Sequence, residues 1–211
     1  MKVTKAQSAA NRERIIEAAA RLFRRKGLNG ASVAEIAAAA GLTPGALYSH
    51  FKSRKALETE ACAHMARTGA EVWRGIVADN CDRPLKALVD FYLSRDHIGN
   101  ADSGCAFASI GPELARAPAS VRRALAEALP AQIEVLSASA QGTPAQRRRR
   151  ALDLYTRLVG AAVVAQAIDD PVLRQEVLAA AEASIIEPPD AAPPRSRPAR
   201  KSGARGRAVA S

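Results

Sequence analysis

Apolar residues recur at helical spacing along most of this chain. The first run ends at Gly27, a residue type that commonly ends helices. Pro130 predicts a kink or break in a later helix, and 97–103 is expected to be a polar loop. The pattern predicts an all-α protein of about nine helices. These are expected over 11–26, 33–40, 44–51, 53–79, 84–95, 104–116, 118–139, 144–168 and 171–186.

The stretch after the first expected helix carries the start and stop signals of two short helices. Ser32 with Glu35 forms a capping box, and Gly41 ends the shorter helix that follows. Thr43 supplies a second N-cap before Pro44 at the first helical position. Such a pair is typical of a helix-turn-helix, whose second helix enters the DNA major groove. An ordinary helical hairpin in a bundle would carry the same signals.

The outward face of the second short helix favours DNA binding over a plain hairpin. Small side chains at its start allow close approach to DNA, and the polar and basic groups that follow can bind phosphates. The residues expected to contact DNA are Ser32, Thr43, Pro44, Gly45, Ala46, Tyr48, Ser49, His50, Lys52 and Arg54. The phosphate anchors among them are expected to be Tyr48, His50, Lys52 and Arg54.

The first quarter of the chain resembles the TetR family of one-component bacterial transcription repressors. The resemblance is carried by 15–27, 32–41 and 45–57, and Arg54 stands where the family usually has lysine. It implies a homodimer that binds a palindromic DNA operator and is released by a small-molecule effector. The expected organisation is a flexible arm (1–10), a helix-turn-helix DNA-binding domain (11–58), an effector-binding and dimerisation domain (59–187) and a basic tail (188–211).

The formal net charge of +10 points towards a polyanionic partner, but it is unevenly distributed. Residues 188–211 contain six basic residues and one acidic residue, and therefore carry half of the net positive charge. This tail is rich in Pro, Ala and Arg and has almost no large apolar residues, so we expect it to be disordered.

The cysteines and the hydropathy profile indicate the cellular compartment in which the protein is expected. Three widely spaced cysteines favour reduced thiols over a disulfide framework, and no Cys/His spacing indicates a zinc site. No signal peptide or membrane-spanning segment is apparent, so a cytoplasmic protein without a membrane partner is expected.

Cys105 is the candidate sensing residue. It follows a glycine at an expected helix start, where unpaired amides lower the pKa of a thiol. A buried, inert thiol is the alternative. The run 103–107 resembles a TetR subgroup that represses electrophile-detoxification genes, in which the cysteine after this glycine is the sensor, although other members share the pair without a known redox role. The aromatic residues that we expect at the effector site are Trp73, Tyr92, Phe107 and Tyr155. For Trp73, packing in the helical core is the alternative.

The two expected helices 144–168 and 171–186 carry much apolar and small-residue surface. The resemblance implies that this pair forms a two-fold, four-helix dimer interface. An intramolecular core would produce the same pattern of apolar and small residues on these helices.

The sequence also bears on two other classes of function. The chain has no glycine-rich phosphate loop after a strand, and His50, His64 and His97 have no evident catalytic partners, so no enzyme activity, cofactor or metal is expected. A ligand-independent architectural DNA-binding protein is the alternative. The salt and sequence dependence of DNA binding distinguishes it from a repressor.

Overall fold

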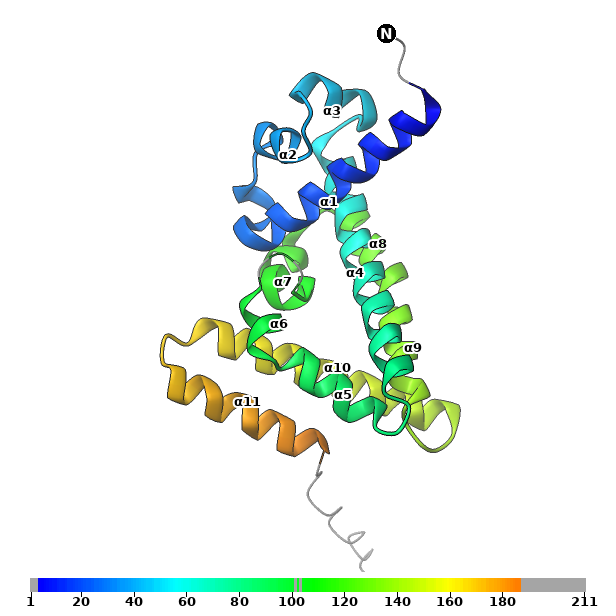
Figure 1. Cartoon of the computed structure of the whole chain (residues 1–211), viewed down its shortest axis with the longest axis vertical. Helices are drawn as coiled ribbons and strands as arrows, with labels where there is room; N and C mark the ends of the chain where they lie inside the picture. Colours follow the sequence, from blue (N-terminus) through cyan, green and yellow to red (C-terminus); the bar gives the residue numbers. More distant parts are fainter. Residues whose placement is uncertain (1–3, 101, 103, 187–211) are drawn as a thin grey trace, which may run out of the picture.

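The computed structural model describes residues 4–100, 102 and 104–186. These residues form eleven helices and no strand (Figure 1). The helices are α1 (Lys5–Gly30), α2 (Val33–Ala39), α3 (Pro44–His50), α4 (Arg54–Asp79), α5 (Pro84–Tyr92), α6 (Arg95–Gly99), α7 (Ala106–Arg116), α8 (Ala119–Ala128), α9 (Pro130–Ala138), α10 (Pro144–Ala167) and α11 (Pro171–Ile186).

The all-α class is confirmed, with two helices more than expected. The first is α6, which lies where a polar loop was expected and begins because the Ser94 hydroxyl accepts the backbone N–H of His97 at 3.1 Å. The second arises at Pro130, where the chain ends α8 and starts α9. The ring of Pro130 cannot donate a backbone hydrogen bond, which makes a separate helix start favourable there.

The first helix begins earlier than expected. Thr4 caps it by accepting the backbone N–H of Gln7 at 3.1 Å, so α1 starts at Lys5 instead of Asn11. Residues 5–10 of the expected flexible arm are therefore helical, which is a correction. Gly27, with φ of 78°, interrupts the regular helix as expected. Residues 1–3 and the expected disordered tail lie outside the described residues.

Two hydrophobic clusters make up the core, and α4 contributes to both. One cluster lies among α1–α4, α7 and α8, where Phe23, Leu47 and Leu57 are fully buried. The other lies among α4, α5, α9, α10 and their neighbours, around Trp73 and Leu158. Figure 1 shows α1–α3 at one end of the molecule and α5, α10 and α11 at the other, with α4 running between them. The helix α4 is thus a continuous connection between the two ends.

No helix in the described part of the chain combines the length and the apolar character needed to cross a membrane.

Candidate functional site

The start of α2 has the capping box expected from the sequence. The Ser32 hydroxyl accepts the backbone N–H of Glu35 at 3.1 Å, and the Glu35 carboxylate accepts the backbone N–H of Ser32 at 2.8 Å. Lys26 of α1 adds an ion pair to the same carboxylate at 2.5 Å. Hydrogen bonds and this cation hold the pKa of Glu35 down, at about 2. The ion pair between Lys26 and Glu35 therefore links the start of α2 to the last part of α1.

The helix α3 is fixed through one face and exposed on the other. Thr43 caps it by accepting the backbone N–H of Ala46 at 3.2 Å, and Pro44 occupies the first turn. Leu47 is fully buried in the core, whereas Tyr48 is 53 % exposed. Gly41, with φ of 68°, allows the tight turn between α2 and α3. Because the backbone of α3 is already fixed, the exposed phenol can contact a partner with little further loss of backbone conformational entropy.

Most of the residues expected to contact DNA are accessible around α3. The exposed ones are Ser32, Thr43, Pro44, Gly45, Tyr48, Ser49 and Lys52, and the half-buried ones are Ala46 and His50. The Ser32 hydroxyl also donates to the Glu35 carboxylate at 2.8 Å, so it is engaged in the capping box.

Arg54, one of the expected phosphate anchors, is bound by groups of the protein itself. Its guanidinium points into the protein, where Nε donates to the Glu58 carboxylate at 2.8 Å and Nη1 donates to the carbonyl of Ala31 at 2.7 Å. Its other terminal nitrogen binds the carbonyl of Leu28, and the group lies 5.9 Å from the ring centre of Phe23. Arg54 therefore joins the start of α4 to the end of α1.

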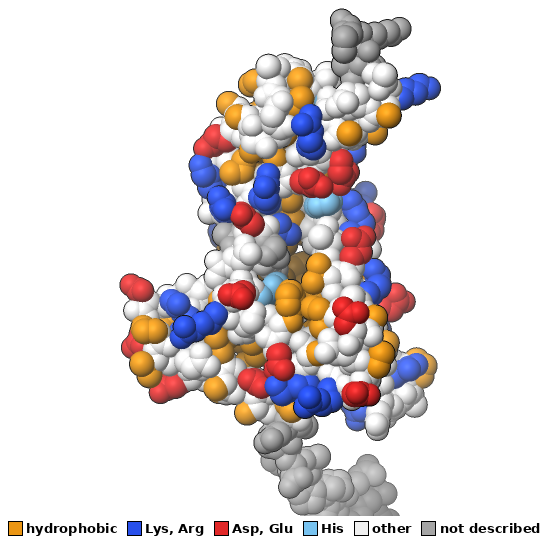
Figure 2. Space-filling view, in the orientation of Figure 1, with side chains coloured by type: hydrophobic (Ala, Val, Ile, Leu, Met, Phe, Trp, Pro, Cys, Tyr) orange, Lys and Arg blue, Asp and Glu red, His pale blue; other side chains and the backbone are white. Residues whose placement is uncertain are grey.

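A cavity of about 580 Å³ lies at mid-height of the molecule, between the end formed by α1–α3 and the opposite end. Figure 2 shows a hollow on this level, with histidine atoms beside it. The elements that line it are α1, α4, α5, α6, α9 and the beginning of α7 with the residues before it. Four of the five residues expected at the effector site line this cavity, namely Cys105, Trp73, Tyr92 and Phe107.

Tyr155, the fifth expected residue, is buried behind the cavity wall instead of lining it. Its hydroxyl lies 4.0 Å from the Cys105 sulfur, and its ring centre is 6.0 Å from that of Trp73 and 6.1 Å from that of Phe107. Tyr155 therefore supports three residues of the wall from α10.

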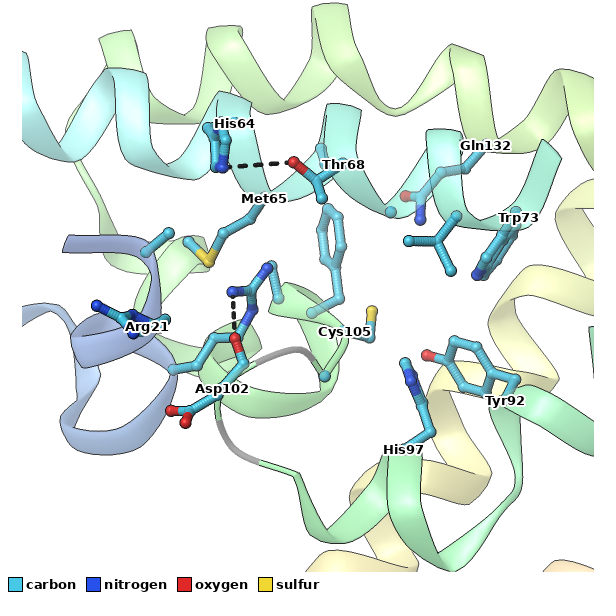
Figure 3. Close-up of a pocket in the computed structure, with 18 of the residues that line it drawn as sticks. Arg21, His64, Met65, Thr68, Trp73, Tyr92, His97, Asp102, Cys105 and Gln132 are labelled. Atoms are coloured by element: carbon cyan, nitrogen blue, oxygen red, sulfur yellow. Dashed lines mark hydrogen bonds between the residues drawn. The ribbon is translucent and has the colours of Figure 1, made fainter. Parts of the chain in front are cut away.

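Sequence reasoning missed the polar part of the lining. Arg24 comes from α1, His97 from α6 and Gln132 from α9, and Figure 3 shows His97 and Gln132 on different sides of the space around Cys105. Arg21, His64 and Thr68 also line the cavity. These positions are far apart in the chain and share no motif, so no signal in the sequence pointed to them as a group.

Four buried polar atoms in the cavity wall have no hydrogen-bond partner among the described residues: Nε of Arg24, the hydroxyl of Tyr92, Nε2 of His97 and Oδ1 of Asp102. The Asp102 carboxylate does form an ion pair with Arg25. Burial lowers the pKa of Arg24 and raises that of Tyr92. Burial, with a smaller contribution from the nearby Arg24 charge, lowers the pKa of His97 to about 4. The imidazole is thus neutral at pH 7, while the guanidinium keeps its charge.

The three thiols differ in environment. Cys62 is fully buried, and burial raises its pKa to about 12, which keeps the thiol protonated and unreactive. Cys81 is exposed, and Cys105 is half-buried in the cavity wall at the N-cap of α7. The described residues contain no group of three or more His, Cys, Asp or Glu side chains placed to hold a metal ion.

Comparison with known proteins identifies a family and relatives that match part of the chain. Residues 15–61 match the family model described as "Bacterial regulatory proteins, tetR family". The chain is 36 % identical over 92 residues to the uncharacterized HTH-type transcriptional regulator YerO of Bacillus subtilis, covering 41 % of this chain and 32 % of that protein. It is 39 % identical over 91 residues to the HTH-type transcriptional repressor KstR2 of Mycolicibacterium smegmatis, covering 43 % and 44 %. These matches span less than half the length of either relative.

The whole fold also has relatives among solved structures. The reduced form of Escherichia coli NemR superposes with a TM-score of 0.69, covering 83 % of this chain and 95 % of that one at 19 % identity. At this level of identity the likeness shows a shared fold.

Proposed function

Because this chain belongs to the TetR family of bacterial regulatory proteins, we propose that it is a transcriptional repressor that binds a palindromic DNA operator as a homodimer and is released by a small molecule. The observation that carries the proposal is the exposed face of α3, anchored by Leu47 and presenting Tyr48 at 53 % exposure. Two relatives that are similar to part of this chain are named a transcriptional regulator and a transcriptional repressor.

In this proposal α3 enters the major groove, and a second copy places its own α3 in the next half-site, about 34 Å away or a small multiple of that distance. Tyr48, His50 and Lys52 bind phosphates, while Thr43 and its small neighbours approach base edges. Few of these side chains can make paired hydrogen bonds to a base, so operator choice depends on methyl contacts and on DNA shape.

Exposed apolar residues on α10 and α11 support the homodimer. Large hydrophobic side chains with at least 38 % exposure on these two helices are Leu152, Val163, Val164, Val172 and Leu173. Apolar side chains gathered on one helix pair favour burial against a partner surface. A second copy would bury the same face of its own α10 and α11, as a two-fold interface requires.

Release follows from the place of the cavity. Its walls come from α1, which packs against α2 and α3, and from helices of the opposite half. A ligand that binds one relative arrangement of these helices more tightly shifts the population towards it, by no more than the difference between the two affinities. The arrangement that fits the ligand but not the operator is the released state.

Covalent modification of Cys105 is a second route to release. Its thiolate would add to the electrophilic carbon of a quinone or another unsaturated carbonyl compound. One S–C bond forms, the carbon–carbon double bond is consumed, and the thiol proton ends on the carbonyl compound. The half-buried position of Cys105 in the cavity wall supports this route.

The test is DNA binding by the purified protein at physiological salt, measured by fluorescence anisotropy. The probes are DNA from the region upstream of its own gene and the same DNA with its sequence shuffled. A repressor prefers the native sequence by a large factor, whereas a nonspecific architectural protein binds both alike. Equal binding would therefore favour the architectural alternative, and no binding to either DNA would contradict both.

A further inference from the structure

We propose that the cavity binds an apolar carboxylic acid in its ionised form, with Arg24 as the counter-ion of the carboxylate. The assignment of this acid as the effector rests on the proposed function, whereas the binding site itself does not.

The charge of Arg24 has no carboxylate partner among the described residues. Its terminal nitrogen donates to the carbonyl oxygen of Asp102 at 2.8 Å, and no direct ion pair of this guanidinium is present among the described residues. The nearby Asp102 charge raises the pKa of Arg24 but does not outweigh the lowering by burial. The Asp102 carboxylate pairs instead with Arg25, at 2.5 Å from its Nε. Burying an unpaired charge is costly, and a ligand carboxylate in the cavity would offset that cost. Guanidinium groups also bind carboxylates through two parallel hydrogen bonds, and the free Nε of Arg24 is available for one of them.

Further unused polar atoms lie in the same wall. Tyr92 is fully buried, yet its hydroxyl has no partner among the described residues, and neither does Nε2 of His97. Figure 3 shows the Tyr92 hydroxyl and the His97 ring directed towards the space beside Cys105. Because a buried hydroxyl normally has a hydrogen-bond partner, a second polar group on the ligand is expected there.

The remainder of the wall is suited to an apolar body. Apolar side chains that line the cavity are Met65, Val72, Trp73, Phe91 and Phe107. The volume of about 580 Å³ falls within the usual range for small-molecule sites, roughly 300–1,000 Å³. The wall thus combines the guanidinium of Arg24, whose Nε is buried and unpaired, with aromatic and aliphatic surface. This combination matches an aromatic or aliphatic acid better than a neutral hydrocarbon or a cation.

Arg24 also gives the acid a direct route to the DNA-reading end. It lies on α1, which packs behind α2 and α3, whereas the aromatic wall belongs mostly to α4, α5 and α7. A bound carboxylate would compete with the Asp102 carbonyl for the guanidinium. Ligand binding would therefore change how α1 is held against the segment that precedes α7.

The experiment uses the full chain and its single tryptophan, Trp73, whose position in the cavity wall makes its fluorescence a direct reporter. The probes are para-tert-butylbenzoate and the neutral para-tert-butylbenzamide, which has nearly the same shape. Because a hydrogen-bonded ion pair replaces a neutral contact, the wild type should bind the acid at least about tenfold more tightly than the amide. Equal affinity for the two probes, or no binding of either, would overturn the proposal.

Variants assign the preference to one residue. Arg24→Leu should lose most of the preference for the acid while keeping its affinity for the amide, and Arg24→Lys, which keeps the charge, should retain part of it. Arg122→Leu, on the exposed surface of α8, is the matched control and should bind both probes like the wild type. A preference that persists in Arg24→Leu would contradict the role of Arg24.

A second readout separates the site from the regulation. The acid is added to the complex of the protein with its upstream DNA, and anisotropy is followed. Loss of the complex in the wild type but not in Arg24→Leu supports the acid as effector. Selective binding of the acid without release of DNA overturns its regulatory role and leaves the site intact. Absence of any DNA binding contradicts the proposed function, while the fluorescence titration still tests the site.

Discussion

The carboxylate of Glu113 on α7 accepts the backbone N–H of Leu28 at the end of α1, at 2.8 Å. It lies directly against Gly27, where an added Cβ atom would be 2.2 Å from its Oε1. Gly27 also has φ of 78°, so neither the space nor the backbone there suits a larger residue. This contact joins the end of α1 to α7.

Glu113→Ala should destabilise the fold by about 1–3 kcal/mol, because it leaves the partly buried N–H of Leu28 without an acceptor. Urea unfolding followed by circular dichroism measures the change. Glu113→Gln keeps an acceptor oxygen and should lose less. Glu134→Ala, an exposed glutamate on α9, is the control and should stay within about 0.5 kcal/mol of the wild type. Equal stability of Glu113→Ala and the control would show that the contact contributes little.

Lys52 and Arg54 should respond to substitution in opposite ways. Lys52→Ala should weaken DNA binding and reduce the slope of log affinity against log salt by about one, without affecting stability, because Lys52 is exposed beside α3. Arg54→Ala should chiefly lower the free energy of unfolding, by about 2–4 kcal/mol, because it removes the bonds to Ala31, Leu28 and Glu58.

For both variants, fluorescence anisotropy over a series of salt concentrations measures DNA affinity, and urea unfolding measures stability. A normal stability for Arg54→Ala together with a reduced salt slope would restore Arg54 as a phosphate anchor and contradict its inward role.

Thiol chemistry should distinguish the three cysteines. Treatment with benzoquinone should modify Cys105 and the exposed Cys81, but not Cys62, whose pKa of about 12 and full burial protect it. Mass spectrometry of peptides identifies the modified sites. In the same samples, DNA should be released from the wild type and from Cys81→Ser, but not from Cys105→Ser. A Cys105→Ser protein that still releases DNA fully would mean that Cys105 is structural.

Stability should fall on acidification through the titration of His97. Its folded-state pKa of about 4 lies below the unfolded value of about 6.5, so the unfolded chain binds a proton first as the pH falls. The neutral imidazole thus contributes its full stabilisation above about pH 6.5, and this contribution is lost as the pH falls from about 6.5 to 4. The free energy of unfolding should fall by about 2–3 kcal/mol at most over this window.

Urea unfolding at a series of pH values tests this. His97→Gln should show a shallower dependence of the unfolding free energy on pH in that window, whatever its absolute stability. Identical slopes for His97→Gln and the wild type would contradict the assignment.

The sequence by itself determined the helices and the helix-turn-helix, because their signals are local. The cap at Ser32, the turn at Gly41 and the start at Pro44 each depend on residues within one helical turn. Short elements were harder to find: α6 is a single turn inside a polar stretch, and the early start of α1 depends on one threonine.

Only the tertiary structure decided where long side chains point and which distant residues meet. Arg54 has the charge of a phosphate anchor, but backbone carbonyls at the end of α1 and the Glu58 carboxylate hold its guanidinium inside. The cavity brings Arg24, Tyr92 and His97 around Cys105 from four different segments. A guanidinium on a flexible stem can lie in solvent or in a cavity wall, and the packing of α1 against α7 selects between these positions through contacts that no local pattern encodes.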